Sequence, residues 1–206
     1  MEMMVWAIAV AVMAYSLKTR AERTRIRLLA SHLRQYDIEK LMETLLEGYA
    51  RALGEPEAGR RESIWQVLAV SEARLAEQFS RFASGFEKVP EAQARVSRLP
   101  FTLPYADRLV PALTFDLREA LKVHARGIER AVSPETTGSG RDRAFTLSAE
   151  LFLMQHTCHW FCKSRAVASA RLLVRHQTSY ALAISSVSRA TRDAYLALVG
   201  RNAAAA

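Results

Sequence analysis

Cysteine is nearly absent from this sequence, which contains only Cys158 and Cys162. A small secreted domain held together by disulfides has more cysteines, spread through its loops, so that class is excluded. Glycine and proline are also few, and runs of β-branched residues, which favour strands, are scarce. We therefore expect an all-α protein in a reducing compartment.

The motifs of common catalytic and cofactor sites are missing as well. Gly138 and Gly140 do not form a phosphate-binding loop, because no strand pattern precedes them and no GxxxxGK motif is present. HExxH, the Glu-x-x-His pairs of di-iron bundles, CxxCH and a nucleophile-elbow serine are absent too. We therefore expect no enzymatic activity and no cofactor.

Charge is missing from residues 3–17, and Glu2 is the only charged residue before Lys18. Residues 1–17 would span about 25 Å as a helix, near the lower limit for crossing the hydrocarbon of a bilayer. The sequence therefore predicts a membrane anchor helix at residues 1–17, with Trp6 contacting the lipid. One feature argues against a full span, because Trp6 and Tyr15 are too close together to mark both interfaces.

Two other interpretations of residues 1–17 remain open. A short apolar run can be the buried or interfacial helix of a soluble protein. It can also be a cleaved signal peptide, with Val12-Met13-Ala14 as the cleavage site, although Met1 to Met4 lack the basic start of such a peptide.

Basic residues follow the apolar run at once and form a collar: Lys18, Arg20, Arg23, Arg25 and Arg27. Positive charge next to a spanning helix favours the cytoplasmic side and attracts anionic lipid headgroups. We therefore expect a single-pass protein of the cell (inner) membrane, with its amino terminus outside and its body in the cytoplasm. Partners of this segment would be membrane lipid and the anionic headgroups.

Ala7, Ala11 and Ala14 recur on one side of the apolar run. Small residues spaced in this way let two membrane helices approach closely. The stripe predicts a protein partner or a second copy of the chain packed against the anchor.

Residues 18–200 are expected to form one helical bundle, followed by a disordered tail at 201–206. Its central element is predicted to be one long helix over 146–176, capped by Thr146 or Ser148 and with Glu150 in its first turn. Other helices are expected from 18 to 36, after Asp37, from a capping box at Ser63, from Thr114 to Val132, and after Ser179 and Ser188. Apolar side chains at helical spacing predict the inward faces of the helices after Asp37 and Ser63, the second of which carries an aromatic stripe: Ile38, Leu41, Leu45, Tyr49, Ala52, Leu68, Leu75, Phe79, Phe82 and Phe86. His124 is expected at the edge of the core.

Cys158, His159 and Cys162 lie within two turns of the predicted long helix. Thiolate and imidazole are ligands for zinc or a redox metal, but one helix cannot close a four-ligand site. The favoured interpretation is two buried thiols that pack as small apolar groups.

Acidic residues are absent from Leu151 to Arg192, and the whole chain carries a formal charge of +8. Such a basic run can bind an anion or nucleic acid, with Lys163, Arg171 and Arg175 as candidate ligands. It can also pair with acids from other helices, such as Glu72.

These observations favour a non-catalytic, membrane-anchored helical adaptor or an accessory subunit of a membrane protein assembly. The first alternative is a protein that binds nucleic acid or another anion through residues 151–192. The second is a metal or redox protein that uses the Cys158, His159 and Cys162 cluster.

Overall fold

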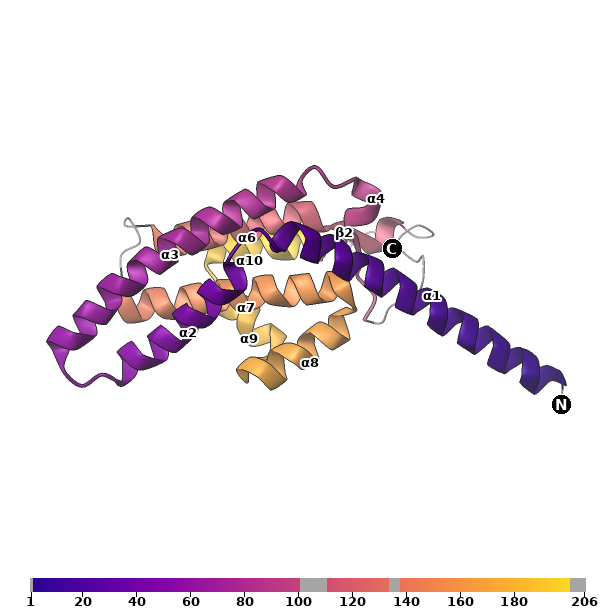
Figure 1. Ribbon diagram of the computed structural model, residues 1–206, viewed down its shortest axis with the longest axis horizontal. Coiled ribbons are helices and arrows are strands. Elements are labelled where there is room, and N and C mark those ends of the chain that lie inside the picture. The colour runs from indigo at the N-terminus through magenta and orange to yellow at the C-terminus, as the bar shows by residue number, and fades with distance from the viewer. Residues whose placement is uncertain (1, 101–110, 134–137, 201–206) are drawn as a thin grey trace.

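The computed structural model describes residues 2–100, 111–133 and 138–200 of the chain. These residues form nine α-helices and one small two-stranded sheet, which confirms the all-α class expected from the sequence. Figure 1 shows a body of packed helices from which helix α1 projects, with the amino terminus at its far end. The tail expected at 201–206 lies outside the described residues.

Helix α1 is one continuous helix, Glu2–Leu33. Its first half contains no buried residue, whereas Leu29 near its end packs in the hydrophobic core. The expected anchor at 1–17 and the basic segment after it therefore belong to a single helix, with no loop between them.

Helix α7, Gly140–Cys162, lies at the centre of the body. It packs against α1 and four other helices: α2 (Ile38–Gly54), α6 (Leu117–Val132), α8 (Arg165–His176) and α9 (Tyr180–Ser186). Two further helices complete the body, α3 (Ala58–Phe86) against α2 and α6, and α10 (Arg189–Val199) against α6. Figure 1 shows α7 enclosed by these neighbours.

The helix expected over 146–176 is divided into α7 and α8. The chain leaves helical geometry at Lys163, where φ is −131° and ψ is −99°, and the Ser164 side chain then caps α8 by accepting from the amide of Val167. Helix α8 folds back along α7, so that Ser169 reaches His156 at 3.0 Å. This reversal buries Ala168 and Leu172, which a straight helix would carry beyond the core.

Several helices also begin at residues other than those expected. Helix α7 begins after Ser139, which forms a capping box with Asp142, so neither Thr146 nor Ser148 caps it. Ser63 lies inside α3 and donates to the carbonyl of Gly59, so the expected capping box there is wrong. Thr114 lies in a strand, and Asp116 caps α6 through the amide of Arg118.

That strand belongs to a short antiparallel sheet that the sequence did not predict. Helix α4 (Glu91–Ala94) leads into β1 (Arg95–Ser97), which pairs with β2 (Thr114–Asp116) after the 3₁₀ turn Pro111–Leu113. Val96 and Phe115 are opposite each other in the pair, and both are buried. The sheet closes one end of the helical body.

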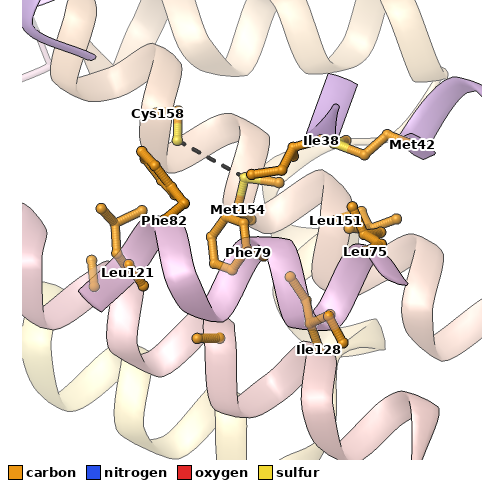
Figure 2. Packing of buried hydrophobic residues seen from close by; sticks show 14 of the residues in the cluster. Ile38, Met42, Leu75, Phe79, Phe82, Leu121, Ile128, Leu151, Met154 and Cys158 are labelled. Atoms are coloured by element: carbon orange, nitrogen blue, oxygen red, sulfur yellow. Dashed lines mark hydrogen bonds between the residues drawn. The ribbon is translucent and has the colours of Figure 1, made fainter. Parts of the chain in front are cut away.

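The aromatic stripe of α3 is part of the core, as expected. All of the apolar positions predicted to face inward on α2 and α3 are buried: Ile38, Leu41, Leu45, Tyr49, Ala52, Leu68, Leu75, Phe79, Phe82 and Phe86. Figure 2 shows Phe79 and Phe82 close to Met154 and Cys158 of α7. Aromatic side chains bury large apolar areas, so this cluster supplies much of the driving force for folding.

Helices α9 and α10 begin where the sequence predicted. The side chains of Ser179 and Ser188 accept hydrogen bonds from the amides of Leu182 and Thr191, which confirms both caps. Each bond satisfies an amide that has no partner within its own helix.

Glu150 is fully buried in the middle of α7 and not in the first turn expected from the sequence. Its carboxylate accepts a hydrogen bond from the amide of Ser188 at 3.2 Å, and burial raises its pKa. Gly127 of α6 provides the space, because a Cβ there would lie 2.4 Å from Oε2 of Glu150 and 2.6 Å from Oγ1 of Thr191. Glycine is therefore required at a helical position where it is otherwise unfavourable.

We predict that Gly127→Ala destabilises the protein. The added methyl group overpacks the site, which costs ~1–3 kcal/mol, against a gain of ~1 kcal/mol in helix propensity. Urea unfolding of the full-length protein in mild detergent should therefore give a lower midpoint. Gly54→Ala is the control, because a Cβ at Gly54 meets no atom within 4 Å. Equal stability of the two variants would contradict the prediction.

Candidate functional site

The apolar half of α1 is exposed along its whole length. Trp6 is 72% exposed and Val12 is 59% exposed, although both side chains are apolar. Among the described helices, α1 alone is long and apolar enough to cross a membrane, and none of its apolar stretch is covered by the body. A helix of this kind at an amino terminus fits either a membrane anchor or a signal sequence.

The alanine stripe lies on this exposed half. Ala7, Ala11 and Ala14 are all exposed and lie on one continuous helix, where steps of four and three residues place them on one face. The face is therefore open to another helix.

The basic collar divides into exposed and engaged residues. Arg20, Arg23 and Arg27 are exposed, in positions suited to headgroups. Lys18 lies 3.9 Å from the carboxylate of Glu22. Arg25 packs over the ring of Phe161, with 5.8 Å between its guanidinium carbon and the ring centroid.

Glu22 joins α1 to the body and was missed by the sequence analysis. Its buried carboxylate lies 2.7 Å from the ammonium of Lys163, at the corner between α7 and α8. One turn from Leu29, the rings of His32 and Phe86 pack in a T-shaped arrangement with their centroids 5.1 Å apart. In the sequence, the only indication of this contact is that Glu22 is an acidic residue within the basic collar. An acid among basic residues suggests a specific ionic partner.

Cys158 and Cys162 are buried free thiols, as expected. Burial raises the pKa of both thiols, that of Cys162 to about 11, and the Sγ atom of Cys158 lies 3.9 Å from Sδ of Met154. Burial and the nearby charge of Arg171 lower the pKa of His159 to about 4. No group of three or more Cys, His, Asp or Glu side chains in the described part of the chain is placed to hold a metal ion.

The cations of the acid-free run do not form one surface. Lys163 pairs with Glu22, Arg165 lies over the ring of Trp160 at 5.6 Å, and Arg189 lies 3.6 Å from Asp193. Arg175 is exposed on α8. Glu72, an expected partner of the run, instead binds Arg143 at 2.9 Å.

A cavity of about 790 Å³ lies where the base of α1 meets the body. Its buried wall is apolar and rich in sulfur: Phe79, Phe82, Met154, Cys158 and Cys162. Its rim carries both signs of charge: Arg34, Asp37, Glu39, Lys40, Lys163 and Arg171. The cavity thus brings together two sets of residues that the sequence suggested for separate sites, the Cys158, His159 and Cys162 cluster and the anion candidates Lys163 and Arg171. Arg175 does not line it.

A buried polar chain links α6, α7 and α10. Nε2 of His124 lies 2.9 Å from Oγ1 of Thr157, which lies 3.1 Å from the hydroxyl of Tyr195. Burial lowers the pKa of His124 to about 3, so its imidazole is neutral near pH 7. The sequence placed His124 at the edge of the core, and the structure buries it completely. This chain satisfies polar groups inside the bundle and does not reach the cavity.

Comparison with known proteins assigns no family to this chain, which matches no protein-family model, no curated protein and no solved structure. Its function must therefore be inferred from its own geometry.

We predict that both native thiols react slowly. Their raised pKa values leave little thiolate near pH 7, and the thiolate is the reactive form. A maleimide reagent should modify the folded full-length protein far more slowly than the protein unfolded in urea. Ala50→Cys supplies an exposed thiol on α2 as a control for the reagent. Native thiols that react as fast as this control would show that Cys158 and Cys162 are not protected.

Proposed function

We propose that this chain is a non-catalytic adaptor or accessory subunit of a membrane protein assembly. Helix α1 holds it in the cell (inner) membrane as a single span, with the amino terminus outside and the body in the cytoplasm. The observation that carries this proposal is the apolar, wholly exposed first half of α1, which extends away from the body (Figure 1). Water is an unfavourable environment for such a surface, and a bilayer is a favourable one.

The attachment of α1 to the body favours a retained anchor over a cleaved signal peptide. The helix runs without interruption from Glu2 to Leu33, and Glu22 and Leu29 fix its second half. The apolar half is therefore held at a fixed direction relative to the bundle. Cleavage after Ala14 would remove most of the exposed apolar surface that this arrangement presents.

The exposed arginines support the proposed orientation. Arg20, Arg23 and Arg27 directly follow the apolar half and are free to face anionic headgroups. Each basic residue near an anionic membrane contributes on the order of 1 kcal/mol. Positive charge at this end of a span favours retention on the cytoplasmic side.

The states of the buried titratable groups support a non-catalytic role. A general base works best with a pKa near the working pH, and a catalytic cysteine with a lowered pKa. Here burial lowers the pKa of His124 and His156 to about 3 and raises the pKa of Cys158 and Cys162. These groups are neutral near pH 7 and are suited to packing. An adaptor must instead offer surfaces, and the alanine stripe of α1 is one.

We predict that deleting residues 2–17 releases the protein from the membrane. The full-length protein should stay in the membrane fraction after carbonate extraction, and the deleted form should be soluble. A chimera with an unrelated apolar helix in place of residues 2–17 is the control and should return to the membrane. Full-length protein that is soluble without detergent would refute the anchor. An intact mass lacking residues 1–14 would instead indicate a cleaved signal peptide.

We predict that the alanine stripe contacts another helix in the membrane. In a background whose two native cysteines are alanine, Ala7→Cys, Ala11→Cys and Ala14→Cys should each give a disulfide-linked species on mild oxidation. Ala9→Cys is the matched control, because it lies about 200° around the helix from Ala7. Gel mobility and mass spectrometry would show whether the partner is a second copy or another protein. Equal crosslinking at Ala9 would remove the case for a specific face.

A further inference from the structure

The cavity at the base of α1 has the size and lining of a ligand site. Its volume of about 790 Å³ lies within the range of roughly 300–1,000 Å³ that is typical of small-molecule sites. Its wall is built by Phe79 and Phe82 of α3 and by Met154 and Cys158 of α7, and all four are buried (Figure 2). The flexible thioether of Met154 adapts to apolar ligands and the two phenyl rings add large apolar area, which suits this wall to an alkyl chain.

The two ends of the cavity differ in charge. At one end, Asp37 pairs with Arg74 at 2.7 Å, and Glu39 and Lys40 of α2 also line the cavity, so both signs of charge are present there. At the other end, one helical turn further along α7, Lys163 directly follows Cys162, and Arg171 lies on α8, which packs back along α7. Two of the cations that line the cavity, Lys163 and Arg171, therefore lie on either side of the corner between α7 and α8, at its mouth.

Arg171 is the cation at this mouth that is available to a ligand. Lys163 already has the carboxylate of Glu22 at 2.7 Å, and Arg25 lies over the ring of Phe161. In the described part of the chain Arg171 has no acidic partner, and its side chain is exposed at the rim. A guanidinium binds carboxylate and phosphate oxygens with two parallel hydrogen bonds.

The position of the cavity indicates where such a ligand would come from. Ile26 and Leu33 of α1 line the cavity, and the same helix carries the exposed apolar segment. At ~1.5 Å per residue, Ile26 lies only about 14 Å along the axis beyond Leu17. A lipid that leaves the bilayer beside α1 would therefore have only this short distance to travel to the cavity.

We propose that this cavity binds a single-chain anionic lipid, with its acyl chain against Phe79, Phe82 and Met154 and its anionic head at Arg171. The ligand class is one alkyl chain with one carboxylate or phosphate, as in a fatty acid or a lysophosphatidate. This site is distinct from the membrane anchor and from the alanine stripe. The body of the protein would thus bind lipid at a site separate from the anchor.

The test is photolabelling of the full-length protein in phosphatidylcholine nanodiscs with a palmitate analogue that carries a diazirine on its chain. Peptide mapping should place the label on α7 around residues 154–162 and on the facing parts of α2 and α3. Palmitate and lysophosphatidate should compete, and the stronger competitor identifies the head group. Hexadecanol, which lacks the charge, and inorganic phosphate, which lacks the chain, should not compete.

Two exposed positions allow variants that leave the core intact. Ala30→Trp should block the mouth, because Ala30 lines the cavity and its side chain is exposed. Arg171→Glu should lower labelling roughly tenfold, which corresponds to the loss of one charge-assisted hydrogen bond. Val70→Trp and Arg126→Glu introduce the same side chains at exposed positions that do not line the cavity, and they should label as the parent does.

Each other outcome overturns a stated part of the proposal. Label confined to residues 2–17, or unchanged by Ala30→Trp, would show that the cavity is not a lipid site. Equal competition by hexadecanol, or full labelling of Arg171→Glu, would remove the role of Arg171. Competition by phosphate alone would show a small-anion site. If the chain proves soluble without detergent, the proposed membrane anchor is refuted. The same labelling carried out in buffer would still test whether the cavity binds lipid.

Discussion

Lys163 and Ser164 form the corner on which the arrangement of α1, α7 and α8 depends. Lys163 leaves helical geometry, and the Ser164 side chain supplies the acceptor that starts α8 in a new direction. The ammonium of Lys163 then lies at the end of α7, where it reaches Glu22. A straight helix would carry Arg171 about 12 Å further along the axis of α7, away from the cavity that it now borders.

Buried carboxylates fix the other contacts between helices. Glu72 accepts from the hydroxyl of Tyr49 at 2.8 Å and from Arg143 at 2.9 Å, which ties α3 to α2 and α7. Glu150 holds the start of α10 through the amide of Ser188. A buried carboxylate without partners is strongly unfavourable, so each of these pairs allows few alternative positions for its helices. Together with Glu22, they select one packing of an apolar core that could be filled in several ways.

The same constraint places a cavity beside the base of helix α1. Because Glu22 and Leu29 fix α1 against α7, the base of α1 forms one side of a space whose floor is the sulfur and aromatic side chains of the core. Polar and charged groups remain at its rim, where water reaches them. An apolar floor, a cationic mouth and an adjacent exposed helix are thus consequences of one set of contacts.

The amino-acid sequence alone was enough to predict the all-α class of the protein and much of its local structure. Helical periodicity identified the inward faces of α2 and α3, and single serines identified the starts of α9 and α10, because both signals act within a few residues. The absence of charge from residues 3–17 likewise identified the exposed segment of α1 without any tertiary information. The pattern around Cys158 and Cys162 was enough to predict that both thiols are buried.

The break at Lys163, the burial of Glu150 and the cavity at the base of α1 all depend on tertiary contacts. Helical periodicity continues through residues 163 and 164, so nothing local shows that folding back gains the burial of Leu172. Glu150 reads as a first-turn acid until Ser188, 38 residues later, is placed beside it. The pair of Glu22 and Lys163 spans 141 residues, and one sequence contains no signal that joins positions so far apart. Such contacts depend on how whole helices pack, and the cavity is formed by the same packing.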